Sequence, residues 1–304
     1  MGKKMNRSIT ILTFLICLTF ELMAQLPIPT SGKIVRLTGL SWDKIETRNV
    51  DVWLPQNYEK DSLKRFPVLY MHDGQNLFDA RLSYGGKEWL VDETITLLSS
   101  KGIIEECIVV GIWNSPKRFQ EYMPEEPFYK MAKNLQDTII KDRGGKPLSD
   151  NYTDFLINQL IPKIDKEFRT LSNKENRFIA GSSMGGLISL YTILKYPEFF
   201  DAAACLSTHW PVCLKQNNPS IPSAIISWMN DKIPTNPPYI LYFDFGTETL
   251  DAWYEPYQDL ATSYLVNKGF PQGNLLVSKY TGEAHNEESW SKRFPEIVTF
   301  LLKK

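Results

Sequence analysis

The sequence predicts an α/β fold in which a mostly parallel central sheet carries helices on both faces. Three observations predict this class. The 304 residues are 43% hydrophobic, enough for a full core. From residue 32 onward, short β-rich runs alternate with helical stretches, as in sheets whose parallel strands are joined by crossover helices. The runs 67–71 and 107–112 are almost wholly apolar, which is typical of strands covered on both faces.

The first 24 residues have the pattern of a secretory signal. Basic residues come first, an apolar run follows over 9–20, and residues 22–24 offer a cleavage site before Gln25. The apolar run is shorter than the roughly 20 residues that a membrane span needs. We therefore expect an exported protein, periplasmic or extracellular, with no membrane span after cleavage. A single domain is expected over 25–304, because no linker divides two cores.

The expected elements follow in order along the chain. Two strands open the domain, and Pro55 closes the second of them. Buried strands are then expected where short apolar runs occur, and helices where apolar residues recur at a spacing of three and four. The strands are expected at 33–40, 50–54, 67–71, 107–112, 178–180, 202–206, 239–243 and 275–280. The helices are expected at 89–98, 152–168, 186–196, 256–268 and 288–302.

Two stretches, 115–151 and 211–238, interrupt this alternation. The first is polar and contains one possible short helix around 130–141, and the second is rich in proline. Both follow predicted strands. We therefore expect them to lie over the carboxyl edge of the sheet, where α/β proteins form ligand sites.

A nucleophile motif lies between a predicted strand and a predicted helix. Residues 181–185 read Gly-Ser-Ser-Met-Gly and match G-x-S-x-G. In a strand–turn–helix context this motif is a nucleophile elbow, because the flanking glycines permit a tight turn that lifts the serine above the sheet. Ser183 is thus the predicted nucleophile. The alternative is an ordinary turn whose serine caps the helix.

The chain has three histidines, at positions 72, 209 and 285, and His285 is the predicted general base. It follows the last predicted strand and precedes the final helix, which is where elbow hydrolases place the base. A solvated surface histidine is the alternative. The three histidines could also be read as a zinc site, but their spacing contains no short metal-ligand motif.

The acid of a catalytic triad is expected after the strand 239–243. Asp251 and Glu248 both lie in the loop that follows, whereas Asp244 is expected to belong to the strand. We predict Asp251, which lies beyond the Gly246-Thr247 turn and could orient an imidazole. Glu248 is the reserve, and a helix N-cap is the alternative role of Asp251.

The oxyanion hole is assigned to the backbone N–H groups of Gln75 and Met184. Met184 follows the nucleophile, and Gln75 follows the strand 67–71 beside Gly74, which permits a close backbone approach. Several tryptophans fall near predicted strand ends, which suggests an aromatic cleft. Among them we predict that Trp210 borders the site and binds substrate by stacking.

Charge and cysteine usage exclude some functions. A net charge of −1 does not fit a chain built to grip nucleic acid, whose surface would be basic. The cysteines form no CxxC motif. Cys205 and Cys213 bracket a loop and could pair in an oxidising compartment, or they could be buried free thiols. The oligomeric state is not predicted.

Together these features resemble the esterase D-like family of α/β hydrolases, which includes feruloyl and acetylxylan esterases, siderophore esterases and mycolyltransferases. The resemblance extends over about 45–302. It rests on Tyr-Met-His-Asp-Gly-Gln-Asn-Leu-Phe at 70–78, Gly-Ile-Trp-Asn at 111–114, Arg118, Glu-Tyr-Met-Pro at 121–124, the elbow, and His285-Asn286 ahead of Trp290. The resemblance implies an α/β-hydrolase fold and a serine ester hydrolase without cofactor or metal. In many members the acid stands three residues after the glycine of the Gly-Thr turn, where this chain has Thr249.

The predicted function is a secreted serine carboxylic-ester hydrolase with a Ser183–His285–Asp251 triad. Short-acyl or aryl esters of carbohydrate are the expected substrates, and neither interrupting stretch is apolar enough for a lipase lid. Hydrolysis of a catecholate trilactone siderophore is an alternative within the same chemistry. A peptidase of the same fold, or a non-catalytic carbohydrate-binding protein on this scaffold, would also be compatible with the fold class.

Overall fold

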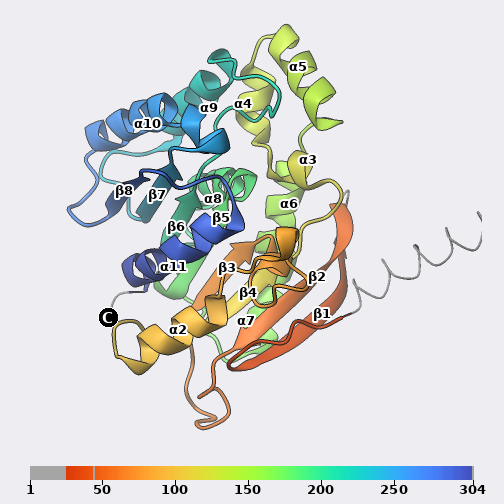
Figure 1. The fold of residues 1–304 in the computed structure, drawn as a ribbon, viewed down its shortest axis with the longest axis vertical. Coiled ribbons are helices and arrows are strands. Elements are labelled where there is room, and N and C mark those ends of the chain that lie inside the picture. The colour runs from red at the N-terminus through yellow and green to blue at the C-terminus, as the bar shows by residue number, and fades with distance from the viewer. Residues whose placement is uncertain (1–24, 44, 303–304) are drawn as a thin grey trace, which may run out of the picture.

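An eight-stranded sheet forms the centre of the protein in a computed structural model that describes residues 25–43 and 45–302 (Figure 1). The predicted secretory signal lies outside the described residues. The strand order is β1-β2-β4-β3-β5-β6-β7-β8. The strands are β1 (Lys33–Trp42), β2 (Ile45–Leu54), β3 (Val68–His72), β4 (Ile108–Ile112), β5 (Arg177–Ser182), β6 (Ala202–Leu206), β7 (Ile240–Gly246) and β8 (Leu275–Tyr280).

The sheet is mostly parallel, as predicted. β1 and β2 pair antiparallel, β2 and β4 pair antiparallel, and every pairing from β4 across to β8 is parallel. All residues of β3, β4, β5 and β6 are buried, which explains their continuous apolar runs. Because parallel strands end at the same edge, the loops that follow β3, β5, β6, β7 and β8 meet there.

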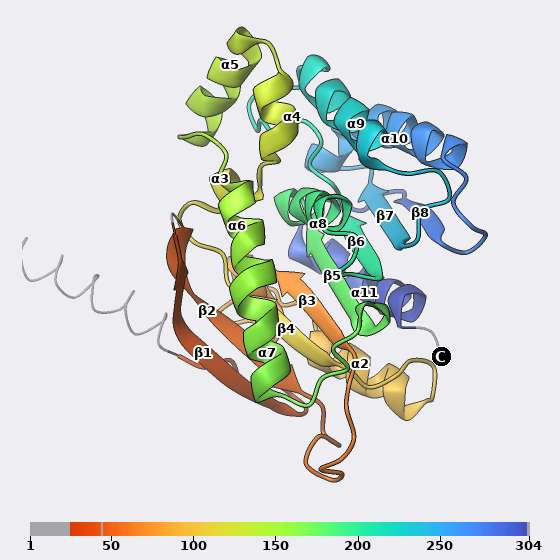
Figure 2. The ribbon, with the colours of Figure 1, turned by 180° about the vertical axis from the view of Figure 1, so that it is seen from behind.

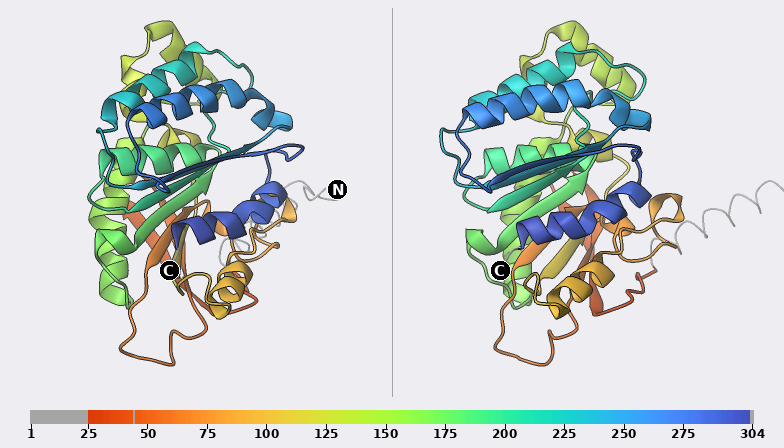
Figure 3. Two further views of the ribbon diagram at one scale, coloured as in Figure 1. Left: turned by 90° about the vertical axis from the view of Figure 1, so that its left-hand side faces the viewer. Right: turned by 60° about the vertical axis from the view of Figure 1, so that its left-hand side comes forward.

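Helices cover both faces of the sheet (Figures 2 and 3). On one face α2 and α11 pack against side chains such as Leu69 and Ala204. On the other face α6, α7, α8, α9 and α10 pack against a larger set that includes Tyr70 and Ala203. The helices are α2 (Val91–Ser100), α3 (Arg118–Tyr122), α4 (Glu125–Lys130), α5 (Lys133–Arg143), α6 (Ser149–Phe155), α7 (Ile161–Glu167), α8 (Met184–Lys195), α9 (Ser220–Lys232), α10 (Glu255–Asn267) and α11 (Glu287–Leu301). A π-helical segment η3 (Leu156–Leu160) joins α6 to α7.

The two interrupting stretches contain more helix than the sequence predicts. Residues 115–151 include α3, α4, α5 and the start of α6, whereas the sequence indicates one short helix. Residues 211–238 include α9, whose apolar residues Ile221, Ile225 and Met229 recur at helical spacing and are buried. The prolines of this stretch obscure the pattern, but Pro219 and Pro222 lie at the start of α9, where proline is tolerated.

Two further expectations concern the membrane and the cysteines. Among the residues that the structure describes, no helix is both long and apolar enough to cross a membrane. Cys205 and Cys213 are both buried and free, so the suggested pairing is not formed. Cys107 is also a buried free thiol.

Candidate active site

Ser183 lies at a tight turn between β5 and α8. Its backbone adopts φ 59° and ψ −122°, a conformation that L-residues rarely adopt and that the surrounding structure must hold in place. Its N–H donates to the carbonyl of Leu206 (2.8 Å), and its own carbonyl accepts from the N–H of His209 (3.2 Å). A Cβ at Gly181 would stand 2.7 Å from the carbonyl carbon of Gly185, so this turn requires glycine there.

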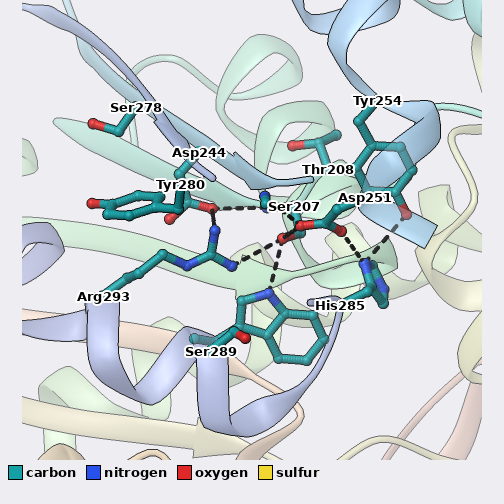
Figure 4. Close-up of polar contacts among 12 residues, drawn as sticks. Ser207, Thr208, Asp244, Asp251, Tyr254, Ser278, Tyr280, His285, Ser289 and Arg293 are labelled. Carbon is teal, nitrogen blue, oxygen red and sulfur yellow. Dashed lines mark hydrogen bonds and ion pairs between the residues drawn. The ribbon is translucent and has the colours of Figure 1, made fainter. Parts of the chain in front are cut away.

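The structure brings Ser183, His285 and Asp251 into one hydrogen-bonded chain. His285 Nε2 lies 2.9 Å from Ser183 Oγ, and His285 Nδ1 lies 2.6 Å from Asp251 Oδ1. Figure 4 shows the Asp251 carboxylate directed at the imidazole of His285. Asp251 is 1% exposed, whereas Ser183 and His285 are partly exposed and so within reach of a substrate. This arrangement can transfer the serine proton to the imidazole.

The second oxygen of Asp251 is held by two donors. Oδ2 accepts from the N–H of Gly246 (2.6 Å) and from Ser207 Oγ (2.7 Å). Ser207 Oγ in turn accepts from Trp290 Nε1 (2.9 Å) and from Arg293 Nη2 (3.1 Å). The carboxylate therefore has one orientation, with Oδ1 directed at the imidazole.

Glu248, the reserve acid, lies elsewhere. It is exposed at the start of the 3₁₀ helix η5 (Thr249–Trp253), and Asp251 lies within this helix rather than at the first position of α10. Thr249 has a different role, because its Oγ1 accepts from the N–H of His285 (2.9 Å). The threonine at this position therefore fixes the backbone of the histidine loop, while the carboxylate comes from two residues further on.

His209 lies beside His285, with 6.2 Å between ring centroids, in a different environment. Arg143 Nη2 lies 3.1 Å from His209 Nε2, and Tyr254 Oη lies 2.6 Å from His209 Nδ1. A guanidinium only donates, so Nε2 accepts and Nδ1 donates to the tyrosine. Burial, with the neighbouring imidazole of His285 and the guanidinium of Arg143, holds the pKa of His209 well below its usual range.

The predicted oxyanion loop follows β3 and approaches the elbow closely. A Cβ at Gly74 would stand 2.3 Å from the backbone carbon of Gly111, so only glycine fits there. Gly185 lies against this loop, because a Cβ there would be 3.4 Å from Asp73 Oδ2. Met184 begins α8, so its N–H belongs to a helix N-terminus, and Gln75 is partly exposed in the 3₁₀ helix η1 (Gly74–Asn76).

Asp73 holds this loop in place through a dense set of hydrogen bonds. Its carboxylate accepts from Arg118 Nε and Nη2, both at 2.7 Å, and from Asn114 Nδ2 at 2.6 Å. Burial alone would raise the pKa of Asp73, but the charge and hydrogen bonds of Arg118 outweigh it and lower the pKa. Asp73 therefore remains an anion that ties the loop after β3 to α3.

The prediction that Trp210 stacks on substrate is wrong. Trp210 is fully buried: its ring stacks on Phe243 with centroids 6.2 Å apart, and its Nε1 donates to Gln258 Oε1 (3.2 Å). It follows β6 closely and turns inward, into the core under α10. Trp89, Trp113 and Trp290 do not line the predicted aromatic cleft either, because all three side chains are buried. Trp253 is partly exposed.

The three histidines do not converge as a zinc site would require. His72 Nδ1 lies 2.8 Å from Tyr152 Oη, and burial lowers the pKa of His72 to about 3. The imidazole of His209 is engaged by Arg143 and Tyr254, and among the three imidazoles only that of His285 hydrogen-bonds to Ser183 Oγ. His72 therefore supports the core beneath α6.

Comparison with known proteins gives the family. The Esterase family model, described as "Putative esterase", matches residues 45–301. The chain belongs to this esterase family. Its enzyme class is accordingly serine carboxylic-ester hydrolase, as the sequence predicts, and the non-catalytic alternative is set aside.

Individual relatives agree with this assignment. The esterase is 30% identical over 273 residues to the uncharacterized protein YbbA of Bacillus subtilis, with 88% of this chain and 97% of that protein covered. It is 30% identical over 189 residues to an endo-1,4-beta-xylanase/feruloyl esterase of Xylanibacter ruminicola, covering 60% of this chain and 23% of that protein.

A ferulic acid esterase structure has a TM-score of 0.63 at 18% identity, with 89% of this chain and 98% of that chain covered. The enterobactin esterase of Shigella flexneri has a TM-score of 0.63 at 13% identity, with 90% and 60% covered, and these structures confirm the α/β-hydrolase fold.

Sequence reasoning missed the residues that support the acid and the base. Ser207, Arg293 and Tyr254 have no motif of their own, and each acts through a contact between distant segments. One signal was available. Ser207 directly follows β6, at the same sheet edge as the elbow and the acid, so a polar residue there could have been considered.

Proposed function

We propose that this esterase is exported and hydrolyses short-acyl or aryl esters of carbohydrate by two-step acyl transfer at Ser183. The observation that carries the proposal is the continuous chain from Ser183 Oγ through His285 to Asp251, with contacts of 2.9 and 2.6 Å. It has the geometry of a nucleophile, its base and the acid that orients the base. Gln75 and Met184 complete the site as oxyanion donors.

In the proposed mechanism, His285 Nε2 accepts the proton of Ser183 as the serine oxygen attacks the ester carbonyl. Asp251 keeps Nδ1 protonated and stabilises the imidazolium. The N–H groups of Gln75 and Met184 bind the oxyanion of the tetrahedral intermediate. His285 then protonates the leaving alcohol, and a water molecule activated by the same imidazole releases the acid from Ser183.

The chemistry beside the elbow favours an uncharged, hydroxyl-rich substrate. Asp73 adjoins Gly185 and accepts from Arg118 and Asn114, and Asn76 Nδ2 donates to Glu287 Oε1 (3.3 Å) next to the histidine loop. Polar side chains of this kind can exchange hydrogen bonds with sugar hydroxyls, which an acyl chain of a lipid cannot do. The feruloyl esterase relative and the ferulic acid esterase structure support the same class of substrate.

A catecholate siderophore is the second candidate, favoured by the likeness to the enterobactin esterase. The charges argue against it. An iron-loaded catecholate is strongly anionic, and arginines near the site are already engaged: Arg118 by Asp73, and Arg143 by Asp142 at 3.2 Å and by the carbonyl of Val212. A site built for such an anion would be expected to offer cations whose charge is not neutralised.

A substrate panel tests the proposal. Methyl ferulate, acetylated xylan, a catecholate trilactone and a long-chain triglyceride are compared by kcat/KM, each with Ser183→Ala as the blank. The carbohydrate-type esters should be hydrolysed at least ten times more efficiently than the trilactone. A preference for the trilactone would move the assignment to siderophores, and a preference for the triglyceride would refute both.

A further inference from the structure

Three carboxylates meet at the start of α2, away from the elbow. Glu88, Asp92 and Glu93 each offer one carboxylate oxygen, and these oxygens all lie within 4.8 Å of one another. Within the described part of the chain, no lysine or arginine forms an ion pair with any of the three. The negative charges are therefore close together without a protein cation between them.

The second observation is that Asp92 is buried, and that each of the three carboxylates has one solvent-inaccessible oxygen without a hydrogen-bond partner. Asp92 is fully buried; its Oδ2 accepts from the N–H of Ser31 (2.9 Å), but its Oδ1 has no hydrogen-bond partner. Glu88 Oε2 and Glu93 Oε2 are likewise inaccessible to solvent and unpartnered. Because leaving a buried oxygen of a charged group unpaired is costly, these three atoms are candidates for a shared proton or for a bound cation.

A proton can satisfy only part of the cluster. One proton shared between two of the carboxyls neutralises one of them and leaves the remaining negative charges close together. A divalent cation would neutralise the cluster more fully and would accept all three oxygens as ligands.

The ligand set fits calcium. All three donors are oxygens, which excludes a preference for zinc or another metal that favours nitrogen and sulfur. Ca²⁺ accepts about six to eight oxygen ligands in a flexible geometry, whereas Mg²⁺ demands a near-ideal octahedron and usually keeps several of its waters. The three carboxylate oxygens lie within 4.8 Å of one another, close enough for one ion to contact all three.

We propose that Glu88, Asp92 and Glu93 bind one Ca²⁺ ion that stabilises the fold and takes no part in acyl transfer. Water molecules and nearby backbone oxygens would supply the remaining ligands. The ion would hold α2 to the segment around Thr30 and Ser31, because Thr30 Oγ1 donates to Glu93 Oε1 (2.5 Å) and Ser31 bonds Asp92.

The position of the cluster connects it to the active site. Glu88 directly precedes Trp89, whose ring packs against that of Trp290 with centroids 5.9 Å apart. The N–H of Trp89 donates to the carbonyl of Asn76 in η1 (2.9 Å), and Trp290 donates to Ser207, which holds Asp251. Leu90 has φ 53°, a conformation that is strained for leucine and needs support from its neighbours. The ion would give that support.

Calcium binding to metal-free protein tests the proposal. The chain from Gln25 is treated with EDTA, dialysed, and titrated with CaCl₂ at pH 8 by isothermal calorimetry and by thermal unfolding. We expect one ion per chain and a rise in Tm of about 5 °C at saturation. The rise should shrink at pH 5, where protons compete for the carboxylates. No heat of binding and an unchanged Tm at pH 8 would overturn the proposal.

Variants separate this site from a general effect of salt. Asp92→Asn and Glu88→Gln should each reduce the calcium-induced Tm shift at least fivefold. Two variants are used so that, if one of them does not fold, the other still tests the proposal. Asp259→Asn is the matched control, since Asp259 is an exposed aspartate on α10. An equal loss in the control, or the same Tm shift from NaCl of equal ionic strength, would overturn the proposal.

Discussion

His285 and His209 lie side by side at the carboxyl edge of the sheet, yet their surroundings suit them to different tasks. His285 is partly exposed and lies between a serine hydroxyl and a carboxylate, so it can gain and lose a proton. His209 is buried between Tyr254 and Arg143, where burial and neighbouring positive charge hold its pKa low. The charge of the side chains that contact each histidine and the access of solvent therefore decide which histidine can act as a base and which serves as a structural hydrogen-bonding group.

The largest change in activity is expected when the nucleophile is removed. Ser183→Ala should lower kcat for p-nitrophenyl acetate by about 10⁴ to 10⁶, with Tm unchanged, because the hydroxyl is lost but no core volume is. Ser182→Ala, at the end of β5, is the matched control and should keep most of the activity. Retention of more than a tenth of the activity by Ser183→Ala would refute the assignment.

The next test concerns the acid on the His285 side. Asp251→Asn should lower kcat by about 10⁴, because an amide can stabilise the wrong tautomer of the imidazole. Glu248→Gln should leave kcat close to that of the unmodified enzyme, since the Glu248 side chain is exposed and its link to the histidine loop is a backbone hydrogen bond to the carbonyl of Glu283 (3.0 Å), which the substitution keeps. Kinetics of the two variants measured side by side decide the question, and the opposite ranking would give the role to Glu248.

A third test concerns the core on the His209 side. Trp210→Ala should lower the free energy of unfolding by about 3–5 kcal/mol, because it opens a cavity under α10. Its KM for a carbohydrate ester and for p-nitrophenyl acetate should change by the same factor. Urea unfolding and kinetics report the two effects. An unchanged stability with a higher KM for the carbohydrate ester alone would restore the stacking role.

The smallest expected effect is that of the hydroxyl between the two histidines. Tyr254 Oη lies 2.6 Å from His209 Nδ1 and 3.4 Å from His285 Nδ1. Tyr254→Phe should lower kcat about 2- to 10-fold with little change in KM, as expected for the loss of a positioning hydrogen bond. Tyr257→Phe, in the first turn of α10 just after Tyr254, is the control. Equal losses of kcat in both variants would show that the effect is not local to the histidines.

The fold and the side chains of Ser183, Asp251 and His285 could be predicted because sequence features close to each of them mark their positions. The elbow is visible in sequence because its glycines are required within a few residues of Ser183, and the loops of Asp251 and His285 follow recognisable strands. Trp210 was misplaced for a physical reason. Its position after β6 fixes which edge of the sheet it is near, but whether the ring turns outward or inward depends on Phe243 and Gln258, which are distant in sequence.

The helices of 115–151 and 211–238 were underestimated for a related reason. Short helices such as α3 and α4 have too few turns for an apolar periodicity to show, and they are stable because they pack on other elements. The hydrogen bonds by which Ser207 and Arg293 support Asp251 join residues more than 40 positions apart, so only the place of Ser207 directly after β6 could have indicated them.

The unpaired thiols have a practical consequence for producing the enzyme. Burial raises the pKa of Cys213 to about 11 and raises those of Cys107 and Cys205 as well, so few thiolates exist at neutral pH to react. Folding of residues 25–302 therefore needs no disulfide-forming oxidase and no disulfide isomerase. The recombinant chain should reach the same specific activity in a reducing cytosol as in an oxidising compartment, and dithiothreitol in the assay buffer should leave its rate unchanged.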